Sequence, residues 1–308
     1  RNRITANISN HYVTIASISF GLALLAVFID IPLTHDVSWQ FWLARQMNGG
    51  TPLYGHLMEI NPPLWFWMAA GIDTVAKVFS IDPLNLYISM IILWAIFAAV
   101  VFTRLADFAD DKTSTGVSLF VLALLLVAPM YDFGQREQLT AIGVIPYVAL
   151  ISRRQRQQPV SWYLAMSIGV LAAVGIAMKH YFIVVPIGLE LWLLFELRRN
   201  WRPIRWETAA MGLCAAFYGG AMLIYTPEFL SHIVPLVAAA YNGYERPFFL
   251  QILRSEVLIW IFCLAWIGYS RIRQSDAAPV PLLRALVIAS LGFIAAYFAQ
   301  KKGWQYHA

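Results

Sequence analysis

The sequence predicts an all-α, polytopic transmembrane helical bundle, and three features of its composition carry this prediction. Of the 308 residues, 60% are hydrophobic and 13% are charged, whereas soluble domains have about 45–50% and about 25%. The mean hydropathy is +0.63. A chain of this size cannot hide so many apolar side chains in one water-facing domain. A soluble enzyme, a disordered chain and a disulfide scaffold are therefore not expected.

Apolar segments recur along the whole chain and predict about nine membrane spans, since a hydrocarbon core about 30 Å thick needs about 20 apolar residues per helix. The expected spans are residues 12–33, 85–103, 116–131, 139–151, 160–178, 181–197, 208–225, 251–269 and 283–299. Several are short, so they must extend into flanking residues. We expect one transmembrane domain over residues 1–308, incomplete at both ends.

Segment 62–80 is ambiguous, because it could span the bilayer or lie along its surface. Lys and Arg concentrate in cytoplasmic loops. If 62–80 lies on the outer surface, 14 of the 22 Lys and Arg residues are cytoplasmic; if it spans, 9 are. The first arrangement is favoured. It gives a long outer loop over residues 34–84 and cytoplasmic basic clusters at 153–156 and 198–205.

Two surface helices are expected within the 34–84 loop. Apolar residues recur at helical spacing at Trp39, Trp42, Leu43 and Met47. Polar residues lie between them, which is typical of an amphipathic helix in the headgroup plane. Gly and Pro residues at 48–52 then end this helix. Pro62-Pro63 opens the second helix, because proline suits a first helical turn.

The net charge and the two cysteines do not indicate nucleic-acid binding, a disulfide framework or a metal site. The net charge is +5, and in a membrane protein Lys and Arg anchor the cytoplasmic loops, so no nucleic-acid partner is expected. Cys214 and Cys263 lie inside apolar segments and offer neither a disulfide framework nor a metal-ligand spacing. No nucleotide-binding or soluble-hydrolase motif occurs, so nucleotide chemistry is not indicated.

Two linked motifs occupy the first outer loop. The first is Asp36-Val-Ser-Trp-Gln-Phe-Trp-Leu-Ala44 with the glycine break after it, and the second is Glu59-Ile-Asn-Pro-Pro-Leu-Trp65. In this order after one span they resemble polyprenyl-phosphate-sugar-dependent glycosyltransferases of the GT-C fold, the superfamily of protein O-mannosyltransferases and aminoarabinose transferases. That family has an acidic residue beyond its first span, then an amphipathic helix and a Pro-Pro-Leu-aromatic helix.

The resemblance implies an inverting transfer of a sugar from a polyprenyl-phosphate donor to a glycan, lipid or protein acceptor. It also implies a multi-pass protein of the bacterial inner (plasma) membrane, with its site facing the periplasm. Such a donor carries its own leaving group, so the reaction needs a base for the acceptor hydroxyl and cations for the phosphate. Asp36 is the candidate base, unless it is an ordinary solvated carboxylate. Glu59 is the second candidate, orienting substrate or holding a divalent metal, which the spacing does not establish.

Cations outside the cytoplasm run against the positive-inside bias and need another reason to be there. The candidate phosphate ligands are Arg136, Lys179, His180, Lys301 and Lys302. The planar fork of Arg136 suits phosphate oxygens, although a surface pair with Asp132 or Glu137 is the alternative. Lys179 and His180 join two spans with almost no loop, where snorkelling is the alternative.

Lys301 and Lys302 open a Lys-Gly-Trp-x-Tyr-His segment, which resembles a segment near the lipid-phosphate site of some of these transferases. An interfacial anchor is the alternative. Two other functions stay open: a transporter or flippase for a lipid-linked substrate, which paired repeats would favour, and a non-catalytic subunit of a larger membrane assembly. Geometry discriminates among them, because an enzyme should bring Asp36 and two outer cations to one cavity.

Overall fold

The computed structural model describes residues 33–108, 110–240, 245–273 and 280–302, and within them the chain is all-helical. The long helices are α2 (His35–Asn48), α3 (Leu64–Phe79), α4 (Pro83–Ala106), α5 (Asp111–Val127), α6 (Arg136–Gln155), α7 (Trp162–Ala177), α8 (Val184–Leu197), α9 (Trp206–Tyr225), α12 (Ser255–Arg273) and α13 (Val280–Ala299). The short ones are η1 (Met130–Asp132), η2 (His180–Ile183), η3 (Arg198–Asn200), η4 (Phe229–Ile233), α10 (Val234–Ala240) and α11 (Phe248–Ile252).

Four helical segments of the described residues are long and apolar enough to cross a membrane. They are Pro83–Ala106, His180–Asn200, Trp206–Tyr225 and Pro281–Ala299. The expected count of about nine spans is not confirmed. The expected span 12–33 lies outside the described residues, and the segments expected at 116–131, 139–151, 160–178 and 251–269 form α5, α6, α7 and α12. These four are helical where expected, but α7, for example, has only 16 residues.

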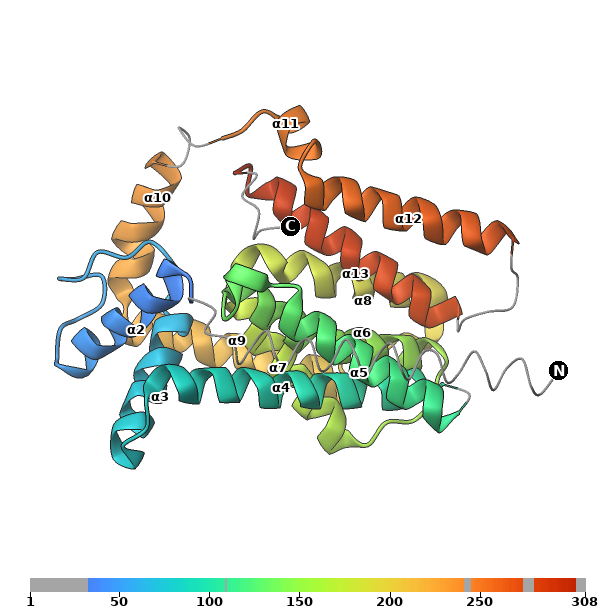
Figure 1. The fold of residues 1–308 in the computed structure, drawn as a ribbon, viewed down its shortest axis with the longest axis horizontal. Helices are drawn as coiled ribbons and strands as arrows, with labels where there is room; N and C mark the ends of the chain where they lie inside the picture. Colours follow the sequence, from blue (N-terminus) through green and yellow to red (C-terminus); the bar gives the residue numbers. More distant parts are fainter. Residues whose placement is uncertain (1–32, 109, 241–244, 274–279, 303–308) are drawn as a thin grey trace.

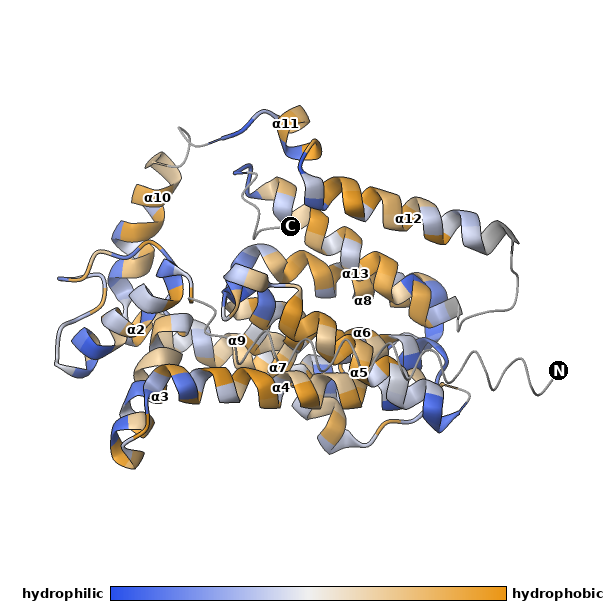
Figure 2. Ribbon diagram, in the orientation of Figure 1, coloured by the Kyte–Doolittle hydropathy of each residue, from blue (hydrophilic) through white to orange (hydrophobic). Residues whose placement is uncertain are grey.

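The helices form a bundle with a distinct end. In Figure 1, α4, α6, α8 and α13 run along the bundle, whereas α2, α3 and α10 gather at one end and α3 lies across the direction of α4. Figure 2 shows hydrophobic residues along the bundle helices and hydrophilic residues toward their ends. Both helices expected within 34–84 are present, and the described residues between α9 and α12 contain η4, α10 and α11.

Helix α6 is the centre of the bundle, and it packs against α4, α7, α8 and α13. Most of its residues are buried. Glycines bring neighbouring backbones close together. A Cβ on Gly143 of α6 would lie 2.5 Å from the Leu171 carbonyl oxygen of α7. A Cβ on Gly169 of α7 would lie 2.4 Å from the backbone carbonyl oxygen of Glu207 in α9. Such tight contacts hold three helices in register without large side chains.

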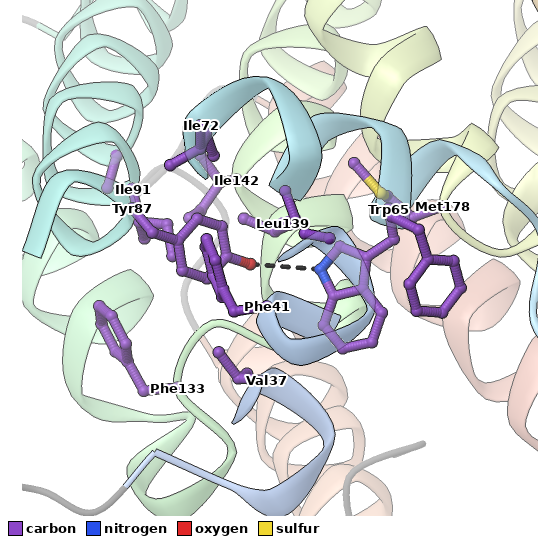
Figure 3. Close-up of a cluster of buried hydrophobic side chains, with 14 of the residues drawn as sticks. Val37, Phe41, Trp65, Ile72, Tyr87, Ile91, Phe133, Leu139, Ile142 and Met178 are labelled. Atoms are coloured by element: carbon purple, nitrogen blue, oxygen red, sulfur yellow. Dashed lines mark hydrogen bonds between the residues drawn. The ribbon is translucent and has the colours of Figure 1, made fainter. Parts of the chain in front are cut away.

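A buried aromatic cluster fixes α2 and α3 to the bundle (Figure 3). The Tyr87 hydroxyl of α4 donates a 2.6 Å hydrogen bond to the Gly134 carbonyl and accepts one of 3.3 Å from the Trp65 indole of α3. The Phe41 ring of α2 packs edge-on to Tyr87, with centroids 5.3 Å apart. Because these rings bury most of their area, they contribute strongly to packing. The cluster places both helices beside the first turn of α6.

The apolar residues expected on one stripe of α2 are divided between its exposed and buried faces. Leu43 is fully buried, but Trp39 and Trp42 are 43% and 45% exposed, and their rings stack on each other 4.7 Å apart. The buried face is centred on Val37, Phe41 and Ala44. The sequence spacing cannot separate these two faces, because both carry large apolar residues and the choice depends on where α3 and α4 pack.

We predict that Gly169→Ala destabilises the fold. The added methyl group would collide with the Glu207 backbone and push α7 from α9, a form of overpacking that typically costs about 1–3 kcal/mol. Thermal unfolding in detergent should show a lower Tm. Gly212→Ala on α9 is the matched control, because nothing lies within 4 Å of its Cβ position. Equal Tm values for the two variants would contradict the tight α7–α9 contact.

Candidate functional site: a cation-lined cavity at one end of the bundle

A cavity of about 410 Å³ lies where α6 begins and α13 ends, and it is called the cation cavity below. Its lining residues are Ile60, Asn61, Pro62, Arg136, Lys179, His180, Tyr181, Phe229, Val234, Val237, Ala238, Glu245, Ala299, Gln300, Lys301 and Lys302. These residues come from distant parts of the sequence. All five side chains named above as candidate phosphate ligands are among them.

Arg136 begins α6 and is buried, with 5% of its surface exposed. One terminal nitrogen, Nη1, donates a 2.6 Å hydrogen bond to Oδ1 of Asn61, and the guanidinium lies 5.1 Å over the Trp65 ring. Its Nε is buried without a hydrogen-bond partner. The alternative surface pair with Asp132 or Glu137 does not form, since Arg136 enters no ion pair among the described residues. A buried cation without a carboxylate favours an anionic ligand.

Lys179 lies between α7 and η2, and its side chain turns into the bundle instead of snorkelling outward. It is 8% exposed, and its Nζ lies 2.6 Å from Oε1 of Glu137, in the first turn of α6. Burial lowers the pKa of Lys179 to about 8. The positive charges of Arg136 and Lys302 act in the same direction, and Glu137 acts against them. The ammonium group is therefore still mostly protonated at pH 7 and loses its proton as the pH rises through about 8.

The end of α13 supplies two more cations. Lys302 is half-buried, and burial together with the charge of Arg136 lowers its pKa to about 8. Lys301 is more exposed and forms a 2.9 Å ion pair with Glu245. His180 is exposed, and its ring lies 4.2 Å from that of Tyr181. The rest of the expected 301–307 segment lies outside the described residues.

The cation cavity carries more positive than negative charge. Arg136, Lys179, Lys301 and Lys302 line it, whereas Glu245 is the one carboxylate among its described lining residues. Glu137 and Glu59 lie just outside the lining, and with them the four cations and three carboxylates leave a formal charge of +1. The lowered lysine pKa values follow from burial and from this excess. A phosphate monoester carries about −1.5 to −2 charges at neutral pH. Its charge therefore complements that of the cavity.

Glu59 lies beside the cavity and holds its wall in shape, but it does not line it. One oxygen, Oε1, accepts hydrogen bonds from the backbone nitrogens of Ile60 and Asn61 and from the Asn61 amide at 2.7–2.9 Å. The other, Oε2, accepts a 2.8 Å hydrogen bond from the Trp39 indole. Because both oxygens are engaged in this loop, the expected direct catalytic or metal-holding role is not favoured. Glu59 instead orients Asn61, which receives Arg136.

No metal site is evident in the described part of the chain. No three His, Cys, Asp or Glu residues there are grouped to hold a metal ion.

Asp36 lies in the first turn of α2, and its side chain is 28% exposed. Its Oδ2 accepts a 3.0 Å hydrogen bond from Nε2 of Gln135, and its Oδ1 lies 3.0 Å from the His35 ring. The expected convergence of Asp36 and two cations on one cavity is therefore met by the cations alone, because Asp36 does not line the cation cavity. The side chain of Gln135, which holds Asp36, belongs to the residue directly before Arg136 of the cavity wall.

The sequence alone did not identify Gln135 and Asn61 as site residues, although they hold Asp36 and Arg136. The compact polar turn over residues 132–138 was the one signal that could have indicated Gln135. Nearby, Asp132 is partly buried, and burial raises its pKa, with the charges of Glu137 and Asp36 adding to the effect.

Comparisons of the chain with protein-family models, curated proteins and solved structures found no match. The assignment of a function therefore rests on the chemistry of these side chains.

Anion binding in the cation cavity should weaken as the pH rises through about 8. Lys179 and Lys302 have pKa values of about 8, so they are charged below this pH and become neutral above it. A phosphate monoester is already a dianion there, since its second pKa is about 6. Calorimetric titration with farnesyl phosphate from pH 7 to 9.5 measures the effect.

The double variant Lys179→Arg/Lys302→Arg is the control, because arginine keeps its charge over this range. Its affinity should stay nearly constant. A wild-type affinity that does not change with pH, or a double variant with the same slope, would exclude these lysines as ligands.

Proposed function

We propose that this protein is an integral-membrane glycosyltransferase that moves a sugar from a polyprenyl-phosphate donor to an acceptor hydroxyl. The observation that supports this most is the cation cavity. Three buried or half-buried cations, Arg136, Lys179 and Lys302, meet there, and Arg136 forms no ion pair with a carboxylate of the described residues. The cavity lies at the bundle end where α2 and α3 gather. A membrane-embedded lipid phosphate suits such a position.

The proposed reaction has one displacement step. The acceptor oxygen bonds to the anomeric carbon of the sugar, and its proton passes to the Asp36 carboxylate. The bond between that carbon and the phosphate oxygen breaks, and the electron pair leaves with the polyprenyl phosphate. Attack from the face opposite the phosphate inverts the anomeric centre. The acceptor is a glycan, lipid or protein hydroxyl.

The positive charge of the cavity matches the increase in negative charge on the phosphate during this step. The donor is a phosphodiester with one negative charge, and the leaving polyprenyl phosphate is a monoester with nearly two. Cations fixed around the phosphate therefore stabilise the departing group more than the bound donor, which is the condition for lowering a barrier. In this proposal Asp36, which is 28% exposed, is held by Gln135 and lies outside the cation cavity, accepts the proton from the acceptor side.

Asp36→Asn should lower kcat by about 10²–10⁴-fold, because the amide keeps the shape but cannot take the proton. Donor binding should change little. Asp36→Glu should restore only part of the activity, since about 1 Å of displacement harms catalytic geometry. The assay follows sugar transfer by the reconstituted protein, using a panel of polyprenyl-phosphate sugars.

Asp132→Asn is the matched control, because Asp132 is a partly buried carboxylate near Asp36 that the mechanism does not use. It should retain activity. Turnover that survives Asp36→Asn but not Asp132→Asn would move the base to Asp132. Wild-type protein that binds the donor and transfers no sugar would favour a non-catalytic subunit, and donor transport without sugar transfer would favour a flippase.

We also propose that the cation cavity faces the periplasm from the bacterial inner membrane, as the positive-inside bias suggests. Single cysteines in a chain lacking Cys214 and Cys263 test this orientation. Met58→Cys, at a position 74% exposed near the cavity, should react with an impermeant maleimide on intact spheroplasts. Gln157→Cys, at an exposed position beyond the other end of α6, should react only after permeabilisation. The reverse pattern would refute the orientation.

A further inference from the structure

A second cavity, of about 550 Å³, lies at the opposite end of the bundle, and it is called the arginine cavity below. Three arginines line it: Arg154 in the last turn of α6, and Arg202 and Arg205 just before α9. Arg154 follows Arg136 by 18 residues in the same helix, a rise of about 27 Å. That separation is close to the thickness of a hydrocarbon core, about 30 Å. The two cavities would therefore lie at opposite surfaces of one bilayer.

A buried ionic network forms one wall of the arginine cavity. Nε and Nη2 of Arg154 each donate a 2.9 Å hydrogen bond to the fully buried carboxylate of Glu207. Nε of Arg205 donates a 2.8 Å hydrogen bond to Glu207, and its Nη2 pairs with Glu190. Two carboxylates thus neutralise two arginines and hold them rigidly in place.

Arg202 is left as the excess charge of the arginine cavity. Its side chain is exposed and forms no ion pair among the described residues. Gln158 also lines this cavity, and its Oε1 is a buried acceptor without a hydrogen-bond partner, although buried polar atoms are normally satisfied. The cavity therefore offers one uncompensated positive charge and one acceptor that a hydroxyl group could satisfy.

The remaining wall of the arginine cavity is apolar. Leu193 and Leu197 of α8 line it, together with Ile204 and Trp206, which are 82% and 55% exposed. An apolar wall adds no favourable contact for a small soluble anion, whereas an acyl chain can pack against it. Tryptophan is typical of the bilayer interface, where a headgroup meets its chains.

We propose that the arginine cavity binds one anionic phospholipid, with its phosphodiester at Arg202, a headgroup hydroxyl at Gln158 and an acyl chain along α8. Basic pockets between helices on the cytoplasmic side are suited to anionic headgroups. A choline headgroup would instead bring a cation toward three arginines. The proposal does not depend on the glycosyltransferase function.

Native mass spectrometry of the full chain in detergent tests this proposal by titration with dioleoyl-phosphatidylglycerol, dioleoyl-phosphatidylcholine or inorganic phosphate. Arg202→Gln should weaken phosphatidylglycerol binding by about five-fold, since one basic residue near anionic lipid contributes about 1 kcal/mol. Arg199→Gln is the matched control, because Arg199 is exposed at the same end and does not line the cavity. Its affinity should equal that of the wild type.

Gln157→Glu provides a second variant, because it adds a negative charge at an exposed position of the cavity rim and leaves the buried network intact. It should also weaken phosphatidylglycerol binding. Equal losses for Arg202→Gln and Arg199→Gln would overturn the proposal in favour of diffuse surface attraction. Equal binding of the two lipids would overturn it as well, and so would equally tight binding of inorganic phosphate.

Discussion

Four consecutive polar side chains, Gln135 to Gln138, lie at the start of the central helix α6, and the surrounding helices are positioned by the hydrogen bonds and ion pairs that these side chains form. Buried polar groups are costly unless they are hydrogen-bonded. Gln135 therefore holds Asp36 of α2, and Arg136 holds Asn61 before α3. Glu137 holds Lys179 at the end of α7. Gln138 donates to the Leu125 carbonyl of α5 and accepts from the Gly134 nitrogen.

The two ends of α6 solve the problem of buried charge in different ways. At its end, Arg154 is neutralised by Glu207, and the carboxylates of the arginine cavity offset all but one of its arginines. At its start, Arg136 contacts an amide and an aromatic ring, and it pairs with no carboxylate in the part of the chain that the structure describes. Since isolated buried charge is unfavourable, the first arrangement compensates its charge within the fold. The second is suited to an incoming anion, which is why the proposed chemistry is located there.

Several elements were predictable because they depend on local pattern alone. The apolar segments at 85–103, 208–225 and 283–299 became α4, α9 and α13, since long apolar runs favour helices wherever backbone groups lack water. The Pro62-Pro63 start of α3 followed from the fixed φ of proline. The buried face of α2 was not predictable, because Trp39 and Phe41 are both apolar and only the packing of Tyr87 and Trp65 selects between them.

By itself the sequence determined that the chain is helical and apolar enough for a membrane. It also indicated which cations are candidate phosphate ligands, because Lys and Arg are uncommon outside the cytoplasmic loops. Composition and local spacing suffice for this, because they govern partition into lipid and helix formation. Only the tertiary structure decided that Arg136, Lys179 and Lys302 share one cavity, that Glu59 is engaged in its own loop and that Asp36 reaches Gln135. The cavity brings together residues up to about 240 positions apart in the chain. Helix packing sets which of them meet, and it leaves no local pattern in the sequence.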